Sequence, residues 1–278
     1  MKNGLYLVAS PIGNLNDISA RAVQVLKEAD VIACEDSRVT KKLFSLLGIS
    51  CTREFITYQN YNEEEQSPKL LDILESGKSI ALISDAGSPL ISDPGYKIVR
   101  RCREKGIYVT TIPGCCAVIA ALQLSGLPTN RFMFAGFVPN KEKARIDFLN
   151  DLRNIPSTLV IYETAPRLLK TLSVIKELFG NREVAVAREL TKMYEECLRG
   201  TAEELIAHYT DKAPKGESVI MIAPPSENEL APEIDVESRL KEKMKKMPLK
   251  SAVKEVVTDF GLNKNEVYEL ALRVKNEQ

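Results

Sequence analysis

The chain has 278 residues, with 38 basic and 38 acidic side chains and a hydrophobic share of 44%. This length is enough for two domains, each with its own core. The balanced charge argues against a protein that coats nucleic acid non-specifically, although it leaves room for a local basic patch. The only histidine is His208, which excludes a histidine-rich metal site, and the longest apolar run, 115–122, is too short to span a bilayer. We therefore expect a cytoplasmic protein without a metal and without a membrane segment.

The first part of the chain alternates between strand and helix patterns. Strands are predicted at 5–10, 31–34, 79–83 and 107–112, and helices at 19–29, 38–47, 69–75 and 94–105. Asp93 and Pro94 are expected to begin the last of these helices, as its capping carboxylate and first-turn proline. The alternation predicts an α/β fold with a mostly parallel sheet covered on both faces.

Pro113 and Gly114 interrupt this pattern. The following segment, 115–124, is apolar on all sides and predicts a helix buried between layers. Residues 126–130 resemble a hinge, after which strands are predicted at 132–137, 158–162, 183–187 and 218–222. We therefore expect two α/β domains, at 1–113 and 114–225.

The last part, 232–278, is expected to be a small, helical, basic tail. Apolar residues recur at helical spacing before and after Gly261 and Leu262, which is compatible with a helix-turn-helix. Between Arg239 and Lys254, seven basic residues accompany one acidic residue. This stretch is either a solvated helix face or an arm that binds RNA or phosphate, and the sequence leaves both readings open.

The most informative segment is 82–95, which follows the strand at 79–83. It contains two polar turns, each opened by an aspartate and closed by a glycine. Small residues at the carboxyl end of a strand let a ligand approach the backbone closely, and ligands of α/β sheets bind at that end. The segment therefore predicts a cofactor site.

The other polar loops carry weaker signals. The segment 10–17 has one glycine rather than G-x-G-x-x-G, and the chain has no phosphate-binding G-x-x-x-x-G-K-[ST], so both usual nucleotide motifs are excluded. Asn14 is a ligand contact or a helix cap. At the end of the second strand, helix capping explains Asp36 but leaves Arg38 unexplained.

Charged residues also follow the strands of the predicted second domain. Glu163 either serves the site or forms a structural ion pair with an arginine. The segment 188–192 places Arg188, Glu189 and Lys192 where another strand ends. Lys141, Lys143 and Arg145 occupy one loop that could contact phosphate.

Taken in order, several motifs resemble one family. They are Pro11-Ile-Gly-Asn-Leu, Glu35-Asp-Ser-Arg-Val-Thr, the whole segment 82–95, Ile112-Pro-Gly, Ser125-Gly-Leu-Pro and Arg188-Glu-Leu-Thr-Lys. The set is similar to the tetrapyrrole-methylase superfamily of S-adenosylmethionine (SAM) enzymes. Within it, the chain resembles the branch that methylates a cytidine 2′-hydroxyl in bacterial small-subunit ribosomal RNA. The resemblance covers roughly 4–223 and, more loosely, the tail.

The resemblance implies two α/β domains with SAM in the cleft between them, and a homodimer. The residues that it assigns to the cofactor are Pro11, Ile12, Gly13, Asp85, Ala86, Gly87, Ser88, Ile91, Cys116, Ala117, Thr164 and Leu190. Ser88 stands where tetrapyrrole-methylating relatives usually have aspartate, which favours the RNA-modifying branch. Family members often have histidine where this chain has Gln59, Tyr61 and Pro166, so no imidazole at these positions is essential here.

The chemistry implied is in-line transfer of the methyl group to a ribose hydroxyl, for which the enzyme must align the reacting atoms and remove one proton. The candidates for the catalytic groups are Asp36, Asp85, Glu189 and Lys192. The candidates for substrate contacts are Asn14, Glu35, Arg38, Lys141, Lys143, Arg145 and Arg188. Two alternatives remain: a SAM methyltransferase of a small molecule such as a tetrapyrrole, and a non-catalytic ribosome-binding protein with this fold.

Overall fold

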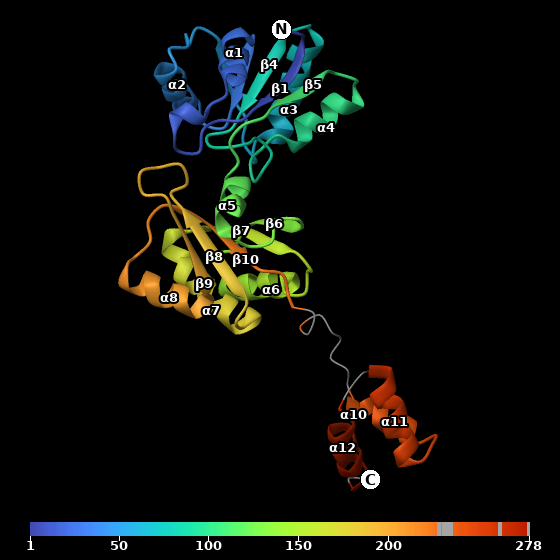
Figure 1. The fold of residues 1–278 in the computed structure, drawn as a ribbon. Coiled ribbons are helices and arrows are strands. Elements are labelled where there is room, and N and C mark those ends of the chain that lie inside the picture. Colours follow the sequence, from blue (N-terminus) through green and yellow to red (C-terminus); the bar gives the residue numbers. More distant parts are fainter. Residues whose placement is uncertain (227–228, 230–235, 261–262, 277–278) are drawn as a thin grey trace. The chain divides into compact units, whose positions relative to one another are not determined.

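The structure, a computed structural model, describes residues 1–226, 229, 236–260 and 263–276 (Figure 1). The chain divides into two compact units, 1–225 and 226–278. Among the described residues, no helix is both long enough and apolar enough to cross a membrane.

The first half of the larger unit is built on a five-stranded sheet in the order β3-β2-β4-β1-β5. All of its strand pairs are parallel. Its strands are β1 (Gly4–Val8), β2 (Val31–Cys34), β3 (Glu54–Thr57), β4 (Ser79–Ile83) and β5 (Val109–Ile112). Its helices are η1 (Leu15–Asp17), α1 (Ala20–Glu28), α2 (Ser37–Leu46), α3 (Glu63–Glu75) and α4 (Tyr96–Glu104).

Both faces of this sheet are covered, as the alternating pattern predicts. Buried residues of α1 and α2 share one core with the sheet, and those of α3 and α4 share another. Residues of β2 and β4 are buried throughout, because a parallel sheet between two helix layers has no solvent face.

Two helices of this half begin elsewhere than predicted. Helix α4 begins at Tyr96, and the N–H of its N-cap residue Gly95 donates to a carboxylate oxygen of Glu63 at 2.7 Å. The expectation that Asp93 caps this helix is therefore wrong. Helix α3 begins at Glu63 and includes Pro68, because Glu63 and Ser67 are buried in tertiary contacts that outweigh the poor helix propensity of proline.

The second half of the larger unit is built on a mixed sheet in the order β6-β7-β10-β8-β9. Only the β6–β7 pair is parallel. The strands are β6 (Phe132–Phe137), β7 (Thr158–Thr164), β8 (Glu183–Arg188), β9 (Glu196–Thr201) and β10 (Glu217–Ile222). The helices are α5 (Ala117–Ser125), α6 (Glu142–Leu152), α7 (Ala165–Phe179) and α8 (Ala202–Asp211).

Helices α6, α7 and α8 pack on one face of this sheet, and α5 packs on the other. The expectation that the apolar segment 115–124 is buried all round is only partly correct. Val118, Ala121 and Leu122 are buried against the sheet, whereas Ile119 and Leu124 are 45% and 46% exposed.

The smaller unit contains α10 (Val236–Met244), α11 (Leu249–Phe260) and α12 (Lys264–Asn276). Buried residues of all three helices form one small core. The sequence predicts only two helices here, because the basic composition of 239–246 hides the apolar positions of α10. The predicted turn at Gly261 and Leu262, and the predicted start of the tail at 232–235, lie outside the described residues.

Candidate active site

A cavity of about 420 Å³ is enclosed by loops and strand ends of both sheets. This volume is typical of a small-molecule site. From the first sheet it is lined by Ile12, Glu35, Asp85, Ala86, Gly87, Ser88, Ile91, Ser92 and Asp93. From the second half it is lined by Cys116, Ala117, Phe137, Tyr162, Glu163, Ala187, Glu189, Leu190, Lys192, Glu217, Ser218 and Val219.

The loops after β1 and β4 are fixed to each other by serines and backbone. Ser10 and Gly87 exchange two backbone hydrogen bonds, of 2.9 and 3.1 Å. The hydroxyl of Ser84 donates to the carbonyl of Gly87 at 3.0 Å. The hydroxyl of Ser88 donates to the carbonyl of Cys115 at 2.9 Å, which ties this wall to the start of α5. The cavity wall is therefore held rigidly before any ligand arrives.

Backbone strain is concentrated around the cavity. Within the described chain, the non-glycine residues with positive φ are Leu90, Ser92, Glu189 and Thr191. They belong to two loops, one from each half, and both loops contribute to the cavity lining. Such conformations cost roughly 1–3 kcal/mol each and gather at functional sites, so their position supports an active site here.

Gly13 lets these two halves approach closely. A Cβ atom at Gly13 would lie 2.6 Å from Cγ of Lys192 and 3.0 Å from the carbonyl oxygen of Leu190. Only a residue without a side chain fits this contact. Gly13 therefore does not line the cavity itself but lets the lining residues Leu190 and Lys192 lie close to the loop after β1.

The cavity is acidic. Its lining contains six carboxyl groups and one basic side chain, Lys192. Two carboxylates have cationic partners, because Glu163 pairs with Arg167 and Glu189 lies 3.1 Å from Nζ of Lys192. The four others leave an excess of negative charge, which favours a cationic ligand.

Three of these carboxyl groups, Glu35, Asp85 and Asp93, influence one another. Burial raises the pKa of each, and repulsion from neighbouring carboxylates adds to the effect. Asp93 is affected most, with a pKa raised to about 6 by burial and by the charges of Glu35, Asp85 and Glu217, while a hydrogen bond from the Ser84 side chain partly opposes the rise. Asp85 accepts a hydrogen bond from the backbone N–H of Asp36 at 3.1 Å, which partly opposes the rise.

The structure brings three of the four predicted catalytic residues to the cavity: Asp85, Glu189 and Lys192. Asp36 is not among its described lining residues. Its carboxylate caps α2 through the N–H of Arg38 at 2.8 Å and pairs with the Arg38 guanidinium at 2.6 Å. These bonds lower the pKa of Asp36 to about 2, which makes it a weak base.

Most predicted cofactor residues also line the cavity. They are Ile12, Asp85, Ala86, Gly87, Ser88, Ile91, Cys116, Ala117 and Leu190. Pro11, Gly13 and Thr164 lie beside the lining residues rather than among them. Thr164 is the N-cap residue of α7, and its N–H donates to the carboxylate of Glu163 at 2.7 Å.

Of the predicted substrate contacts, only Glu35 lines the cavity. Asn14 caps η1 by accepting from the N–H of Asn16 at 3.1 Å. Arg38, Lys141 and Lys143 are exposed at the surface.

The structure contradicts the assignment of Arg145 and Arg188 to RNA phosphates. Arg145 belongs to α6 rather than to a loop, is 4% exposed, and donates to the carbonyl of Asn140 at 3.0 Å. The Arg188 side chain is 11% exposed and pairs with Glu196 at 2.6 Å. Both guanidinium groups donate to acceptors inside the fold, and Nε of Arg145 is buried without a partner among the described residues.

Some lining residues were missed because no local pattern indicates them. Asp93 was interpreted as a helix cap and Ser218 as the ordinary start of a strand, whereas Glu217 lay outside the predicted strand. Ser218 is 2% exposed, and its hydroxyl has no hydrogen-bond partner among the described residues. The register of β10 places Ser218 opposite Glu163 and Arg188, so its position depends on the sheet and not on its neighbours in sequence.

No group of three or more His, Cys, Asp and Glu side chains in the described part of the chain is arranged to hold a metal ion. The charged groups of the site are its carboxylates and its one lysine.

Solved structures with this fold include methyltransferases. Diphthine synthase aligns with a TM-score of 0.62 and 17% identity, covering 79% of this chain and 89% of its own. The cobalamin biosynthetic enzyme cobalt precorrin-4 methyltransferase aligns with a TM-score of 0.57 and 18% identity, covering 79% of this chain and 94% of its own. At these identities the comparison shows the shared fold.

Curated relatives are similar over nearly the whole chain. A ribosomal RNA small subunit methyltransferase I of Erythrobacter litoralis is 49% identical over 98% of this chain and 95% of the relative. The protein of the same name from Escherichia coli O157:H7 is 41% identical over 96% of this chain and 94% of the relative.

Two families match separate parts of the sequence. Residues 231–275 match the RsmI C-terminal HTH domain. Residues 4–206 match the Tetrapyrrole (Corrin/Porphyrin) Methylases, enzymes that take their methyl group from SAM. The chain is a SAM-dependent methyltransferase and belongs to the tetrapyrrole methylase family.

Proposed function

We propose that this enzyme methylates the 2′-hydroxyl of a cytidine ribose in small-subunit ribosomal RNA. The observation that carries the proposal is the pairing of a methyltransferase cavity with a C-terminal unit in one chain. Relatives named for methylation of small-subunit ribosomal RNA share both parts over almost their full length. The solved small-molecule methyltransferases cover only about four-fifths of this chain.

The cavity fits SAM on three counts. SAM carries a sulfonium and an ammonium group, and the cavity wall has more carboxylates than cations. Gly87, at φ 87°, exposes its backbone without a Cβ atom. Ser218 offers a hydroxyl that has no partner in the described fold. We assign the cofactor contacts to Ile12, Ala86, Gly87, Ser88, Ile91, Cys116, Ala117 and Leu190, with Pro11, Gly13 and Thr164 as supports behind them.

The reaction forms a bond between the ribose oxygen and the methyl carbon, while the carbon–sulfur bond breaks and leaves its electron pair on sulfur. The hydroxyl proton must go to a base of the protein. A base works best when its pKa is near the working pH. Asp93 meets this condition with a pKa of about 6, and Glu35 and Asp85 hold that value up by repulsion. We therefore propose Asp93 as the proton acceptor.

Lys192 and Glu189 have a different role in this proposal. Their ion pair of 3.1 Å closes the wall opposite Gly13 and keeps the loop 189–192 in its strained conformation. The pair positions the reactants rather than exchanging protons with them.

We also propose that the enzyme is a cytoplasmic homodimer. The exposed apolar side chains Ile119 and Phe132 line one groove at the surface of the second half, together with Leu122 and Leu127. Leu122 and Leu127 are buried at the base of this groove, so its exposed apolar part is formed by Ile119 and Phe132, and exposed apolar side chains that lie together favour an interface. Light scattering should give twice the monomer mass for the wild type and the monomer mass for Ile119→Asp/Phe132→Asp. A monomeric wild type would contradict the dimer.

The function is tested with labelled SAM and small ribosomal subunits from cells that lack this gene. Transfer to the RNA, with mass spectrometry placing the methyl group on a cytidine ribose, is the expected result. Transfer only to a tetrapyrrole would support the small-molecule alternative. SAM binding without transfer to any subunit or free RNA would support the non-catalytic alternative and overturn the proposal.

A further inference from the structure

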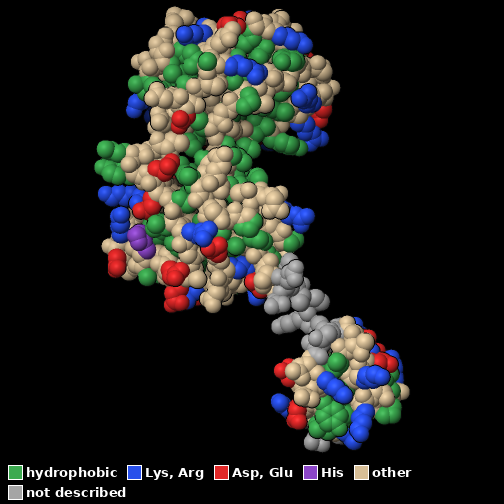
Figure 2. All heavy atoms as spheres, viewed as in Figure 1, with side chains coloured by type: hydrophobic (Ala, Val, Ile, Leu, Met, Phe, Trp, Pro, Cys, Tyr) green, Lys and Arg blue, Asp and Glu red, His purple; other side chains and the backbone are tan. Residues whose placement is uncertain are grey.

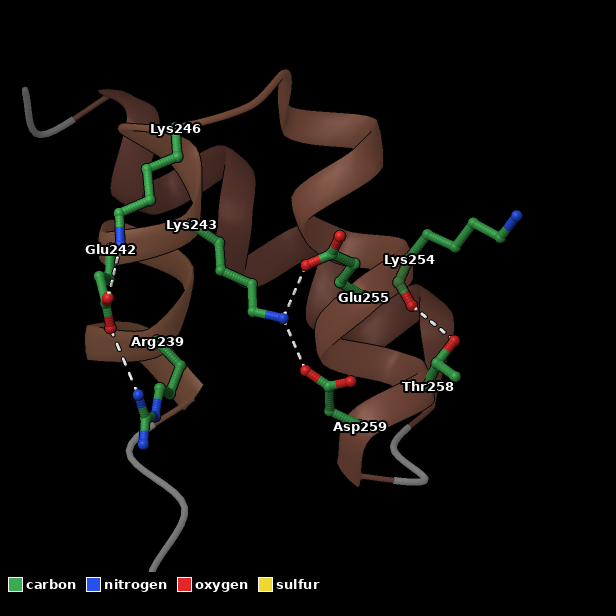
Figure 3. Close-up of polar contacts among 8 residues, drawn as sticks. All are labelled: Arg239, Glu242, Lys243, Lys246, Lys254, Glu255, Thr258 and Asp259. Atoms are coloured by element: carbon green, nitrogen blue, oxygen red, sulfur yellow. Dashed lines mark hydrogen bonds and ion pairs between the residues drawn. The ribbon is translucent and has the colours of Figure 1, made fainter.

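The basic side chains of the C-terminal unit fall into two sets, and Figure 3 draws three residues of the first set and Lys254 of the second. The first set forms ion pairs. Lys243 of α10 contacts Glu255 at 2.8 Å and Asp259 at 2.6 Å, both on α11. Arg239 of α10 and Lys246, which follows this helix, both pair with Glu242 of α10, at 3.3 and 2.9 Å. The charges of this set are matched by carboxylates, and Lys243 joins two helices.

The second set forms no ion pair with a described residue, and all of its members are exposed. It consists of Lys245, Lys250 and Lys254, in the segment 245–254, and of Lys264, Arg273 and Lys275 on α12. In Figure 3 the side chain of Lys254 extends away from the ion pairs. We call the three lysines of the segment 245–254 the lysine surface.

The positions of Lys250 and Lys254 on α11 destabilise this helix in the protein without a ligand. Lys250 and Lys254 are four residues apart on one helix, where like charges repel by a few tenths of a kcal/mol. Lys250 also lies in the first turn, where the helix dipole is positive and where α11 has no acidic residue. A bound anion would relieve both repulsions.

The acidic residues of α11 do not compensate this charge. Glu255 and Asp259 are themselves four residues apart and form a separate row, which is held by Lys243. Lys250, Lys254 and Thr258 form the neighbouring row, and the Thr258 hydroxyl donates to the carbonyl of Lys254 at 2.8 Å. The helix therefore presents one row whose two carboxylates share Lys243 and one row whose two lysines have no ion-pair partner among the described residues.

We propose that the lysine surface binds phosphate groups of the RNA substrate, while Lys243 holds α10 to α11. This inference rests on the proposed function. Phosphate is the ligand class indicated, because three ammonium groups give strong attraction without reading a base. The grooves of A-form RNA also favour contacts to phosphate and ribose over a helix inserted between base edges. The lysine surface thus supplies affinity, and the choice of nucleotide is left to the cavity.

The test compares two full-length variants with the same change in charge. Lys245→Gln/Lys250→Gln/Lys254→Gln removes the lysine surface. Arg239→Gln/Lys241→Gln/Lys246→Gln removes three basic residues of the same unit that pair with Glu237 or Glu242. Affinity for small-subunit ribosomal RNA is measured between 50 and 300 mM salt, and SAM affinity is measured in parallel.

We expect the lysine-surface variant to bind RNA roughly 10- to 100-fold more weakly at low salt. The slope of log K for RNA binding against log salt concentration should become about two to three units shallower. The control should lose less than one unit, and SAM affinity should be unchanged in both. Lys245→Arg/Lys250→Arg/Lys254→Arg should bind RNA like the wild type, which excludes misfolding as the cause. Equal slopes in wild type and lysine-surface variant, or equal losses in both glutamine variants, would overturn the inference.

Failure of this inference is distinct from failure of the proposed function. If the wild type methylates ribosomal RNA and the lysine-surface variant keeps the same salt slope, only the lysine surface is rejected. If the wild type binds RNA through these lysines but transfers no methyl group, only the function is rejected.

Discussion

The two units of this protein differ in local charge at the sites that we propose for their ligands. The cavity of residues 1–225 has six carboxyl groups and one lysine, whereas the stretch 239–254 has seven basic residues and one acidic residue. On the visible face of the larger unit, acidic and basic side chains are interspersed (Figure 2). The net charge of zero therefore hides two local excesses.

This contrast follows from the two substrates. The methyl donor is a cation and the acceptor is a polyanion, so one surface cannot attract both. A basic cavity would repel the sulfonium, and an acidic face would repel RNA. Dividing the two tasks between two units lets each keep the charge that its ligand requires.

The largest effect is expected from Asp93→Asn. If Asp93 accepts the proton, the variant should lose roughly 10²- to 10⁴-fold in kcat while SAM affinity changes little. In the wild type, kcat/KM should fall as the pH drops below about 6, because protonation of Asp93 removes the base. Single-turnover methyl transfer across pH 5–8 measures both. The control is Asp72→Asn, which changes an exposed carboxylate of α3. If the Asp93→Asn enzyme has the pH profile of the wild type, the proton acceptor is another carboxylate of the cavity and not Asp93.

The next effect separates the units. A chain that ends at Pro225 should keep its SAM affinity and lose roughly 10²-fold in RNA affinity at low salt, because it lacks the lysine surface. Calorimetry with SAM and filter binding with ribosomal RNA provide the two readouts. Parallel losses for both ligands would show that the C-terminal unit supports the cavity, and the contrast in charge would then have no functional meaning.

A smaller effect is expected from Gly87→Ala. At φ 87° an alanine is strained by about 1–2 kcal/mol, and its methyl group would lie 3.4 Å from Cγ2 of Ile12, a residue of the cavity lining. We expect SAM affinity to fall about tenfold. Gly48→Ala is the matched control, because Gly48 has φ 64° and no atom within 4 Å of a Cβ. The control should lose similar stability and keep SAM affinity. If both variants bind SAM equally well, Gly87 does not contact the cofactor.

The sequence was informative where a signal is local. Buried strands such as β2 and β4 are apolar along their whole length, so their bounds could be predicted to the residue. The edge strands β3 and β9 were missed, because their residues are partly exposed and show no apolar run. Edge strands of this kind have no second neighbour to bury them.

The same difference between local and long-range signals explains which residues of the site could be predicted from the sequence. The wall at 85–91 could be predicted because unusual turn residues follow one strand. Asp93 could not, because its role depends on Glu63 taking over the cap of α4. Arg145 and Arg188 were assigned to RNA from their charge and from their places in a predicted loop and at a strand end, and only the tertiary structure shows that both are buried. Long-range packing decides which charges face a ligand.

The smallest effect concerns stability. The folded-state pKa of Asp93 is about 6, above the usual 3.8, so the fold favours its protonated form. The corresponding stability is fully present below pH 3.8 and is lost as the pH rises through 6. At pH 8 the ionised carboxylate is therefore unfavourable, and Asp93→Asn should raise the Tm of residues 1–225 by a few degrees. Near pH 3.5 the two proteins should unfold at the same temperature. Thermal unfolding at both pH values measures this difference. A variant that is less stable at pH 8 would show that the hydrogen bond from Ser84 outweighs the cost of burying the charge, whereas a more stable but inactive variant would show that the cavity keeps an unfavourable charge for catalysis.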